Sequence, residues 1–230
     1  MNVDASRSLI ESALAFGKAT VAFSGGKDSS LVLHLVREID PSIQAVFTDT
    51  GIESTSTLEV VRQTPNCETI HPNMNYWQII RKHGWPGQKD KARSHGNACC
   101  RILKETPAHH WYHYNAIDVV FTGLTMAESH QRAIGTDYRG PFYYAKTWGC
   151  YMCHPIWDWR ANEVLDYLRA NNIAYNSSYD RGALRVGCTA CTAYKGWHER
   201  MLHDDPQMYL RVLRVMKHQE MRGGEPCGGW

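Results

Sequence analysis

The residues with the clearest chemistry form the segment VAFSGGKDSS at positions 21–30. Its apolar start predicts the end of a buried strand, Ser-Gly-Gly predicts a tight turn, and the apolar residues after it predict a helix. Such a turn leaves backbone N–H groups unpaired in front of the positive end of the helix dipole. Glycines let a phosphate approach the backbone closely, and Lys27 adds a positive charge. An ordinary glycine-rich turn with a surface lysine is the alternative. The predicted anion-binding residues are Ser24, Gly25, Gly26, Lys27, Asp28 and Ser29.

Four cysteines at short spacings form a second reactive set. Cys99 and Cys100 are adjacent, and Cys188 and Cys191 form a Cys-x-x-Cys pair. In a cytoplasmic protein cysteines are mostly reduced, so close pairs point to metal or redox chemistry rather than to disulfides. Adjacent cysteines are strained as ligands of one Zn²⁺ but can serve two corners of a cubane. A [4Fe–4S] cluster is therefore favoured over zinc, with unrelated buried thiols as the remaining alternative.

An alternation of strands and helices is expected to position these residues. Strands are predicted at 20–23, 44–47, 67–70 and 118–122, and helices at 29–39, 54–63, 76–83 and 100–114. This alternation predicts an α/β fold with a doubly wound parallel sheet covered by helices on both faces. Ligands of such sheets bind beyond the carboxyl ends of the strands.

Polar residues follow two of the predicted strands, where a ligand is expected. An acidic side chain at a strand end can orient a ribose, a metal or a loop. Asp49 could equally form a turn or cap a helix, and Glu128 could simply occupy a first helical turn, where the dipole favours it. The predicted site residues after the second and fourth strands are Asp49, Thr50, Gly51, Gly123, Glu128 and Arg132.

The remaining segments predict one domain over residues 1–222 and a flexible tail over 223–230. Residues 133–160 form a less regular stretch rich in Gly, Tyr and Trp, a helix is predicted from about 161 to 171, and two helical stretches follow Cys191. The first 17 residues predict an amphipathic helix without a signal peptide, and no stretch reaches the roughly 20 apolar residues that span a bilayer. We therefore expect a soluble, cytoplasmic protein with no membrane partner; a homo-oligomer is left open.

These motifs resemble a known family. CCRILKETP at 99–107 looks like the Cys-Cys-x-x-x-Lys-x-x-Pro signature of cluster-bearing adenylyl-sulfate reductases, and GCTACT at 187–192 matches its partner half. SGGKDS resembles the pyrophosphate loop (PP-loop) of the ATP-pyrophosphatase and phosphoadenylyl-sulfate reductase superfamily. Over roughly residues 18–195 the chain thus resembles the iron–sulfur type of the phosphoadenylyl-sulfate (PAPS) and adenylyl-sulfate (APS) reductases.

The resemblance implies an adenine nucleotide α-hydrolase-like fold, APS or PAPS as substrate, and a [4Fe–4S] cluster on the four cysteines named above. It implies that Cys227 attacks the sulfur, giving an S-sulfocysteine from which a thioredoxin-like dithiol releases sulfite. The cluster beside Lys104 would then tune the field of the site rather than carry electrons, and Lys104 would be a catalytic residue together with Cys227. Arginines can clamp phosphate or sulfate oxygens through paired hydrogen bonds. The candidates for that role are Arg132, Arg181 and Arg185.

The sequence also departs from the family pattern. The tail reads Glu-Pro-Cys-Gly around Cys227 where the family has Glu-Cys-Gly, so a solvent-exposed cysteine without function is the alternative for Cys227. Thr125 stands where the family generally has arginine. Cys150 and Cys153 form an additional Cys-x-x-Cys pair. They could be a redox dithiol that relieves Cys227 of its sulfite, or could join Cys188 and Cys191 around zinc. Cys67, in a predicted strand, is expected to be a core residue.

Two other functions stay open on these grounds. One is an ATP pyrophosphatase of sulfur transfer, acting in nucleic-acid thiolation or DNA phosphorothioation, for which the basic residues between 81 and 101 could contact phosphates. Nucleic acid is an expected partner under that hypothesis only. The other is a cluster-bearing redox sensor that retains a nucleotide pocket.

Overall fold

The computed structural model describes residues 2–87, 98–128, 139–183 and 185–220. Contacts divide the chain into two compact units. Unit 1 comprises Met1–Thr48, Thr55–Ile70 and Ala108–Val186, and unit 2 comprises Asp49–Ser54, His71–Pro107 and Gly187–Trp230. The expected single domain over residues 1–222 stays a prediction.

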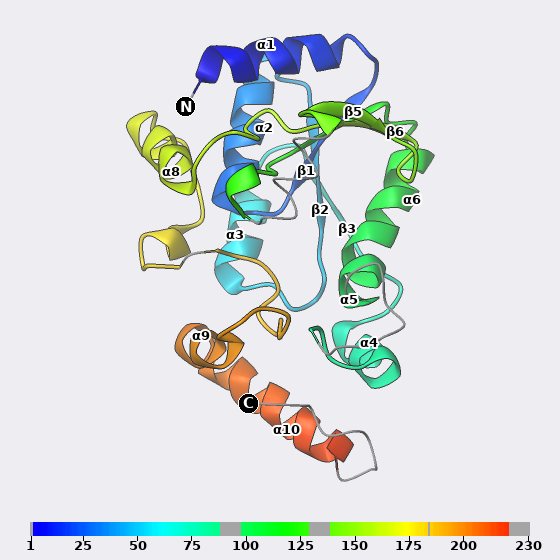
Figure 1. Cartoon of the computed structure of the whole chain (residues 1–230), viewed down its shortest axis with the longest axis vertical. Helices are drawn as coiled ribbons and strands as arrows, with labels where there is room; N and C mark the ends of the chain where they lie inside the picture. The colour runs from blue at the N-terminus through cyan, green and yellow to red at the C-terminus, as the bar shows by residue number, and fades with distance from the viewer. Residues whose placement is uncertain (1, 88–97, 129–138, 184, 221–230) are drawn as a thin grey trace. The chain divides into compact units, whose positions relative to one another are not determined.

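Unit 1 is built on a six-stranded sheet with the strand order β3-β2-β1-β4-β6-β5 (Figure 1). The strands are β1 Ala19–Phe23, β2 Gln44–Thr48, β3 Cys67–Ile70, β4 Val119–Thr122, β5 Phe142–Ala145 and β6 Cys150–Cys153. All neighbours pair in parallel except β5, which runs antiparallel to β6. The predicted α/β fold with four parallel strands is confirmed, and the central strands are apolar because both of their faces are buried.

Strands β5 and β6 lie in the less regular stretch 133–160, for which the sequence pattern predicts no strand. These strands form a hairpin whose turn is closed by hydrogen bonds from the Trp148 and Gly149 N–H groups to the Ala145 carbonyl. Gly149 has φ +66°, which glycine adopts without the steric cost of a side chain. The hairpin extends the parallel sheet by one parallel strand and one antiparallel edge strand.

Helices cover both faces of the sheet, as predicted for a doubly wound fold. Ile10, Leu35, Val61 and Leu168, from four different helices, share one buried cluster. Trp111 and Tyr112 of a fifth helix belong to a separate cluster with the other face of the sheet. The helices of the first face are α1 Val3–Leu14, α2 Lys27–Ile39, α3 Thr55–Gln63 and α8 Ala161–Ala170, and that of the second is α6 Thr106–Tyr114.

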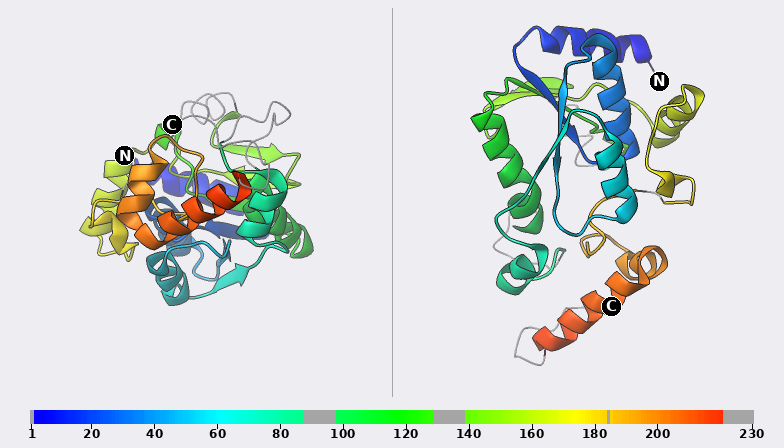
Figure 2. Two further views of the ribbon diagram at one scale, coloured as in Figure 1. Left: turned by 90° about the horizontal axis from the view of Figure 1, so that it is seen from below. Right: turned by 180° about the vertical axis from the view of Figure 1, so that it is seen from behind.

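Unit 2 is mostly helical and has its own core around Tyr76, Ile79 and Ile80. Its elements are α4 Tyr76–His83, α5 Ala98–Cys100, the π-helical turn η1 Arg101–Glu105, α9 Trp197–Asp204 and α10 Pro206–Glu220. The predicted C-terminal helices are confirmed, and α9 packs against α10 (Figure 2). None of the helices in the described residues is long and apolar enough to cross a membrane.

Candidate functional site

The predicted anion loop between β1 and α2 is tied together by one hydroxyl group. Ser29 Oγ donates to the Gly26 carbonyl at 3.0 Å and accepts from the Ser24 N–H at 3.2 Å. The Ser24 hydroxyl also lies 3.1 Å from it. A hydroxyl has one proton and two lone pairs, so these three contacts use the full capacity of Ser29. Ser24 and Ser29 therefore hold the loop in shape.

Glycines in and beside this loop are required by close packing. Gly25 has φ +68°, and a Cβ there would lie 2.9 Å from Thr57 Cγ2. Gly123, which follows β4, lies against backbone atoms rather than a side chain. A Cβ there would lie 2.7 Å from the Asp28 carbonyl carbon and 2.8 Å from the Ser29 nitrogen. The backbone after β4 thus lies directly against the first turn of α2, which gives predicted site residue Gly123 a packing role.

Lys27 is buried within this loop rather than extended into solvent. Only 6% of the residue is exposed, and its Nζ lies 2.6 Å from Asp28 Oδ1. The same ammonium lies 5.8 Å from the centre of the Tyr179 ring, and the Lys27 N–H approaches the Tyr179 hydroxyl at 3.4 Å. A bound phosphate would therefore meet a lysine whose charge is already shared with Asp28.

Tyr179 was absent from the predicted site and is the main addition to it. It lies in the 3₁₀ turn η3 Ser177–Tyr179, and burial raises its pKa despite the hydrogen bond from the Lys27 N–H. Because 152 positions separate it from Lys27, no local sequence signal marks this partner. Arg181, two residues later, donates to the hydroxyl groups of Ser177 and Ser178, both at 3.1 Å. Arg185 is exposed.

Three other predicted residues fall partly or wholly outside the description. Arg132 and Cys227 lie outside the described residues, and so does the side chain of Glu128. The backbone of Glu128 ends the 3₁₀ turn η2 Met126–Glu128. Their predicted roles stay predictions.

The four cysteines Cys99, Cys100, Cys188 and Cys191 line one cavity of about 20 Å³ in unit 2. The first two come from α5, and the other two from a turn in which the Cys191 N–H donates to the Cys188 carbonyl at 3.3 Å. That turn is anchored twice: Thr189 N–H donates to the Ile52 carbonyl at 2.8 Å, and the Tyr76 hydroxyl donates to the Ala190 carbonyl at 2.6 Å. Tyr76, Pro86, Leu103 and Lys104 complete the lining.

A buried carboxylate lies beside this cavity and was not among the predicted site residues. The side chain of Glu53 is 3% exposed and accepts a 2.8 Å hydrogen bond from Thr50 Oγ1. Cys188 Sγ lies 3.7 Å from the same carboxylate, and Lys104 Nζ lies 4.0 Å from it. Thr50 Oγ1 also lies 3.6 Å from Cys188 Sγ. Glu53 is thus the common neighbour of Thr50, Lys104 and Cys188.

The ionisation of these groups follows from their burial and from one another. The hydrogen bond with Cys100, together with burial, raises the pKa of Cys99. Burial also raises the pKa of Cys188 to about 11, although the Lys104 ammonium opposes this. For Lys104 burial disfavours the charge, but Cys188 and Glu53 outweigh it and the pKa is raised. Burial and hydrogen bonding therefore favour the neutral thiol form of Cys99 and Cys188, and their neighbour Lys104 stays charged.

The donor chemistry of the cavity fits an iron–sulfur cluster. Four thiols are the usual ligands of a [4Fe–4S] cluster, in which each sulfur binds a different iron. Within the described ranges, no three His, Cys, Asp or Glu side chains lie close enough together to hold a single metal ion. A cavity of about 20 Å³ has room for about one water molecule. The thiol side chains would therefore have to rotate outwards to admit a cluster.

Asp49, Thr50 and Gly51 belong to unit 2, whereas the anion loop belongs to unit 1. The Gly51 N–H donates to Asp49 Oδ1 at 2.8 Å, and Gly51 has φ +74°. Asp49 therefore closes its own turn, as one alternative had it, and Thr50 contacts the cysteine cavity.

Both proposed roles for the Cys150 and Cys153 pair are wrong. The two residues lie three positions apart in β6, and an odd spacing in a strand directs side chains to opposite faces. Cys153 accordingly belongs to the core of one face and Cys150 to the core of the other. They cannot form a dithiol with each other or chelate one metal together. Cys67 of β3 packs against the sheet core, as expected.

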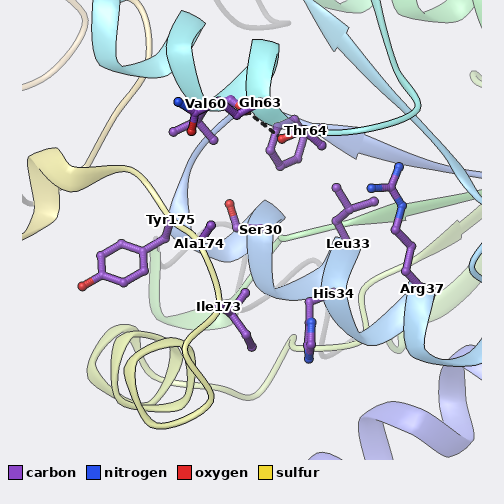
Figure 3. Close-up of a pocket in the computed structure, with 11 residues that line it drawn as sticks. Ser30, Leu33, His34, Arg37, Val60, Gln63, Thr64, Ile173, Ala174 and Tyr175 are labelled. Atoms are coloured by element: carbon purple, nitrogen blue, oxygen red, sulfur yellow. Dashed lines mark hydrogen bonds between the residues drawn. The ribbon is translucent and has the colours of Figure 1, made fainter.

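A hollow of about 260 Å³ lies in unit 1, and its lining includes Phe23 and Ser30, which flank the anion loop. Figure 3 shows its lining side chains coming from α2, from the end of α3 and from residues 173–175. Ser30 Oγ is a buried atom there with no hydrogen-bond partner among the described residues, whereas Arg37 donates to the Ile43 and Pro65 carbonyls. None of the predicted site residues lines this hollow, so it is not the predicted phosphate site.

The sheet, the glycine-rich loop and the cysteine signature place the chain in a known class. The phosphoadenosine phosphosulfate reductase domain family matches residues 18–194. This protein belongs to that family.

Relatives agree with this assignment. An adenosine 5′-phosphosulfate reductase of Bacillus cereus is 28% identical over 188 residues, covering 76% of this chain and 74% of that protein. An uncharacterized protein of Methanocaldococcus jannaschii is 28% identical over 203 residues, which are 85% of this chain and 47% of that protein. The chain thus spans about half the length of this archaeal relative.

Solved structures show the same fold. The phosphoadenylyl-sulfate (PAPS) reductase of Candida auris has a TM-score of 0.61 at 19% identity, covering 80% of this chain and 88% of that chain. The U34-tRNA thiolase NcsA of Methanococcus maripaludis, solved with its [4Fe–4S] cluster, has a TM-score of 0.52 at 13% identity, covering 99% of this chain and 83% of that chain.

Proposed function

We propose that the protein is a sulfonucleotide reductase, which converts APS or PAPS to sulfite and AMP or adenosine 3′,5′-bisphosphate. The observation that carries this proposal is the four-cysteine cavity with Lys104 on its wall, in a chain of this family. A thiol-lined cavity of this kind has no use in simple nucleotide binding.

In this proposal the loop of unit 1 binds the anionic end of the substrate. The N–H groups at the start of α2 and the Lys27 ammonium stabilise the charge that develops on the departing phosphate. Tyr179 holds the backbone of Lys27, and Arg181 and Arg185 would contact the phosphate or sulfate oxygens of the sulfonucleotide. The roles of Arg132 and Glu128 rest on the family resemblance.

Cys99, Cys100, Cys188 and Cys191 would hold a [4Fe–4S] cluster. Such a cluster would supply a fixed charge that tunes the field near Lys104 rather than electrons for the reaction. Glu53 and Thr50 would position Lys104 and Cys188 beside it. The fold shared with NcsA, which was solved with a [4Fe–4S] cluster, supports this assignment.

The proposed reaction has two balanced steps. The Cys227 thiolate attacks the sulfur, a Cys–S bond to sulfur forms, the S–O bond breaks, and the nucleotide leaves with its phosphate. A dithiol then attacks Cys227 Sγ of the S-sulfocysteine and releases sulfite, and its second thiol displaces Cys227 as it closes a disulfide. The transferred sulfur is thus reduced by two electrons at the expense of the dithiol. Cys150 and Cys153 cannot replace this dithiol, because they lie on opposite faces of the sheet.

The decisive experiment measures sulfite from APS and PAPS with dithiothreitol, in parallel with pyrophosphate from ATP. We expect sulfite from at least one sulfonucleotide, and its loss in Cys227→Ser but not in Cys67→Ser. Full sulfite production by Cys227→Ser would remove the tail cysteine from the mechanism.

A second function is favoured by Thr125. This residue is uncharged and 4% exposed, so it does not provide the anion contact that an arginine provides in the family. An ATP pyrophosphatase of nucleic-acid sulfur transfer would not need that contact, and the likeness to a tRNA thiolase supports its fold. Pyrophosphate released from ATP, with no sulfite from either sulfonucleotide, would select this function.

A further inference from the structure

The described side chains of helix α10, which end at His218, form an outer face with basic residues and no acidic one. Arg211, Arg214, Lys217 and His218 are exposed and recur every three or four positions, whereas Val212 on the opposite side is fully buried. No acidic residue occurs between Pro206 and His218. Within the described residues, no carboxylate pairs with Arg211, Arg214 or Lys217. By contrast, Arg200 of α9 pairs with Asp204 of the same helix.

The neighbouring helix α4 extends this basic face. The Arg211 guanidinium lies 4.4 Å from the centre of the Trp77 ring, which places α10 directly beside α4. Arg81 lies one turn after Trp77 and is exposed, as is Lys82. Helix α4 also has no acidic residue. We call Arg81, Lys82, Arg211, Arg214 and Lys217 the basic face of unit 2.

We propose that this basic face docks the protein dithiol that regenerates Cys227, and that this partner presents an acidic surface around its own reactive cysteines. The inference rests on the proposed function, which requires an external dithiol. Unneutralised charges on rigid helices attract an oppositely charged partner over a range set by the ionic strength.

The number of residues between α10 and Cys227 allows this cysteine to reach a partner bound at the basic face. Cys227 is seven residues after Glu220, where α10 ends (227 − 220). Seven residues reach at most about 25 Å. The stripe from Arg211 to His218 lies on that same helix and rises by only about 10 Å along its axis. A partner seated there would be within reach of the tail cysteine.

The composition of the face fits a transient partner of opposite charge rather than a permanent one. Leu210 is the large apolar residue exposed on the described part of α10, at 59%. An obligate interface would need a larger apolar centre. A reductant must leave after each turnover, and rim charges raise association rates more than they raise affinity.

The test compares two reductants at two salt concentrations. The variant is Arg211→Gln/Arg214→Gln/Lys217→Gln, in which glutamine keeps a similar helix propensity. A matched variant removes three exposed charges from unit 1: Lys18→Gln/Arg62→Gln/Lys146→Gln. With an acidic thioredoxin at about 0.01 M salt, where screening is weak, we expect the α10 variant to raise the KM for thioredoxin at least about tenfold. The difference should vanish near 1 M salt, and the unit 1 variant should resemble the parent.

Dithiothreitol separates docking from damage, because this small dithiol needs no docking surface. Its sulfite yield should be equal for all three proteins. The double variant Arg214→Gln/Lys217→Gln keeps the Arg211–Trp77 contact and should show most of the effect. An unchanged KM for thioredoxin, or an equal loss with dithiothreitol, overturns the proposed docking surface.

A binding measurement tests the docking surface independently of turnover. Fluorescence anisotropy of labelled thioredoxin should show salt-sensitive binding that the α10 variant loses. If an RNA hairpin binds this face and thioredoxin does not, the docking proposal fails and nucleic acid is the partner. Absence of sulfite with every reductant would instead refute the proposed function.

Discussion

The two units hold their candidate residues in opposite ways. In unit 1 the loop is local: Ser24, Gly26 and Ser29 lie within six positions and are tied by hydrogen bonds of 3.0–3.2 Å. In unit 2 the cysteine cavity is assembled from separate segments, and its polar contacts to sulfur are long, at 3.6 and 3.7 Å. A local motif forms its site with the helix that carries it, whereas a dispersed site depends on the packing around it.

The two Cys-x-x-Cys pairs make this difference concrete. Cys188 and Cys191 occupy a turn closed by their own backbone hydrogen bond, and both line one cavity. Cys150 and Cys153 have the same spacing in a strand, and they are buried in different cores. The same spacing thus brings two thiols to one cavity in a turn and places two thiols in separate cores in a strand.

The largest expected effect tests whether only the Cys188–Cys191 pair is needed for iron binding. Cys188→Ser should reduce the iron content from about four per chain to below one in anaerobically purified protein, because it removes one cluster ligand. Cys153→Ser should leave the iron content unchanged, although a buried hydroxyl makes the protein less stable. Iron assay and the visible absorption spectrum measure the outcome. A colourless parent protein that contains one zinc ion would contradict the cluster proposal.

The next effect tests whether the loop of unit 1 grips an anion. Lys27→Ala should weaken AMP or APS binding about 10- to 100-fold, since a hydrogen bond to a charged group contributes about 1.5–3 kcal/mol. Lys18→Ala, which removes an exposed charge from the same unit, should have little effect. Isothermal titration calorimetry gives both affinities. Equal affinities for the two variants would place the nucleotide elsewhere.

The strands, the loop and the cysteine pairs were predictable because each is a local pattern. The β5–β6 hairpin was missed because its Tyr- and Trp-rich sequence lacks a clean alternation of apolar and polar residues. Tyr179 was missed because its partner Lys27 is 152 positions away. The two roles considered for Cys150 were wrong because spacing alone does not distinguish a strand from a turn.

A smaller effect separates close packing from backbone strain. Gly123→Ala would place Cβ 2.7 Å from a backbone carbon of α2, and overpacking costs about 1–3 kcal/mol. For a chain of this size the expected loss is about 3–10 °C in Tm. Gly182→Ala has φ +89° but no atom within 4 Å of the added Cβ, so only about 1–2 kcal/mol of backbone strain is expected. Gly123→Ala should in addition weaken AMP binding, because it displaces the loop, whereas Gly182→Ala should not. Equal AMP affinity in both variants would contradict the role of close packing at the loop.

The last prediction concerns thiol reactivity and has the smallest expected effect on function. Burial raises the pKa of Cys150 to about 11 and also raises that of Cys153. At pH 8 only about 0.1% of Cys150 is thiolate, against about a quarter of an ordinary thiol. Iodoacetamide should therefore label Cys150 and Cys153 at least about 100-fold more slowly than the exposed Cys100 in iron-free protein. Because the pKa is raised, labelling of Cys150 should accelerate as the pH rises toward 11.

Peptide mass spectrometry resolves the labelled sites, and unfolding in guanidinium should make the labelling rates of the three cysteines equal. Rapid labelling of Cys150 and Cys153 at pH 8 in the folded protein would show that β6 opens, and would restore the pair as a candidate dithiol.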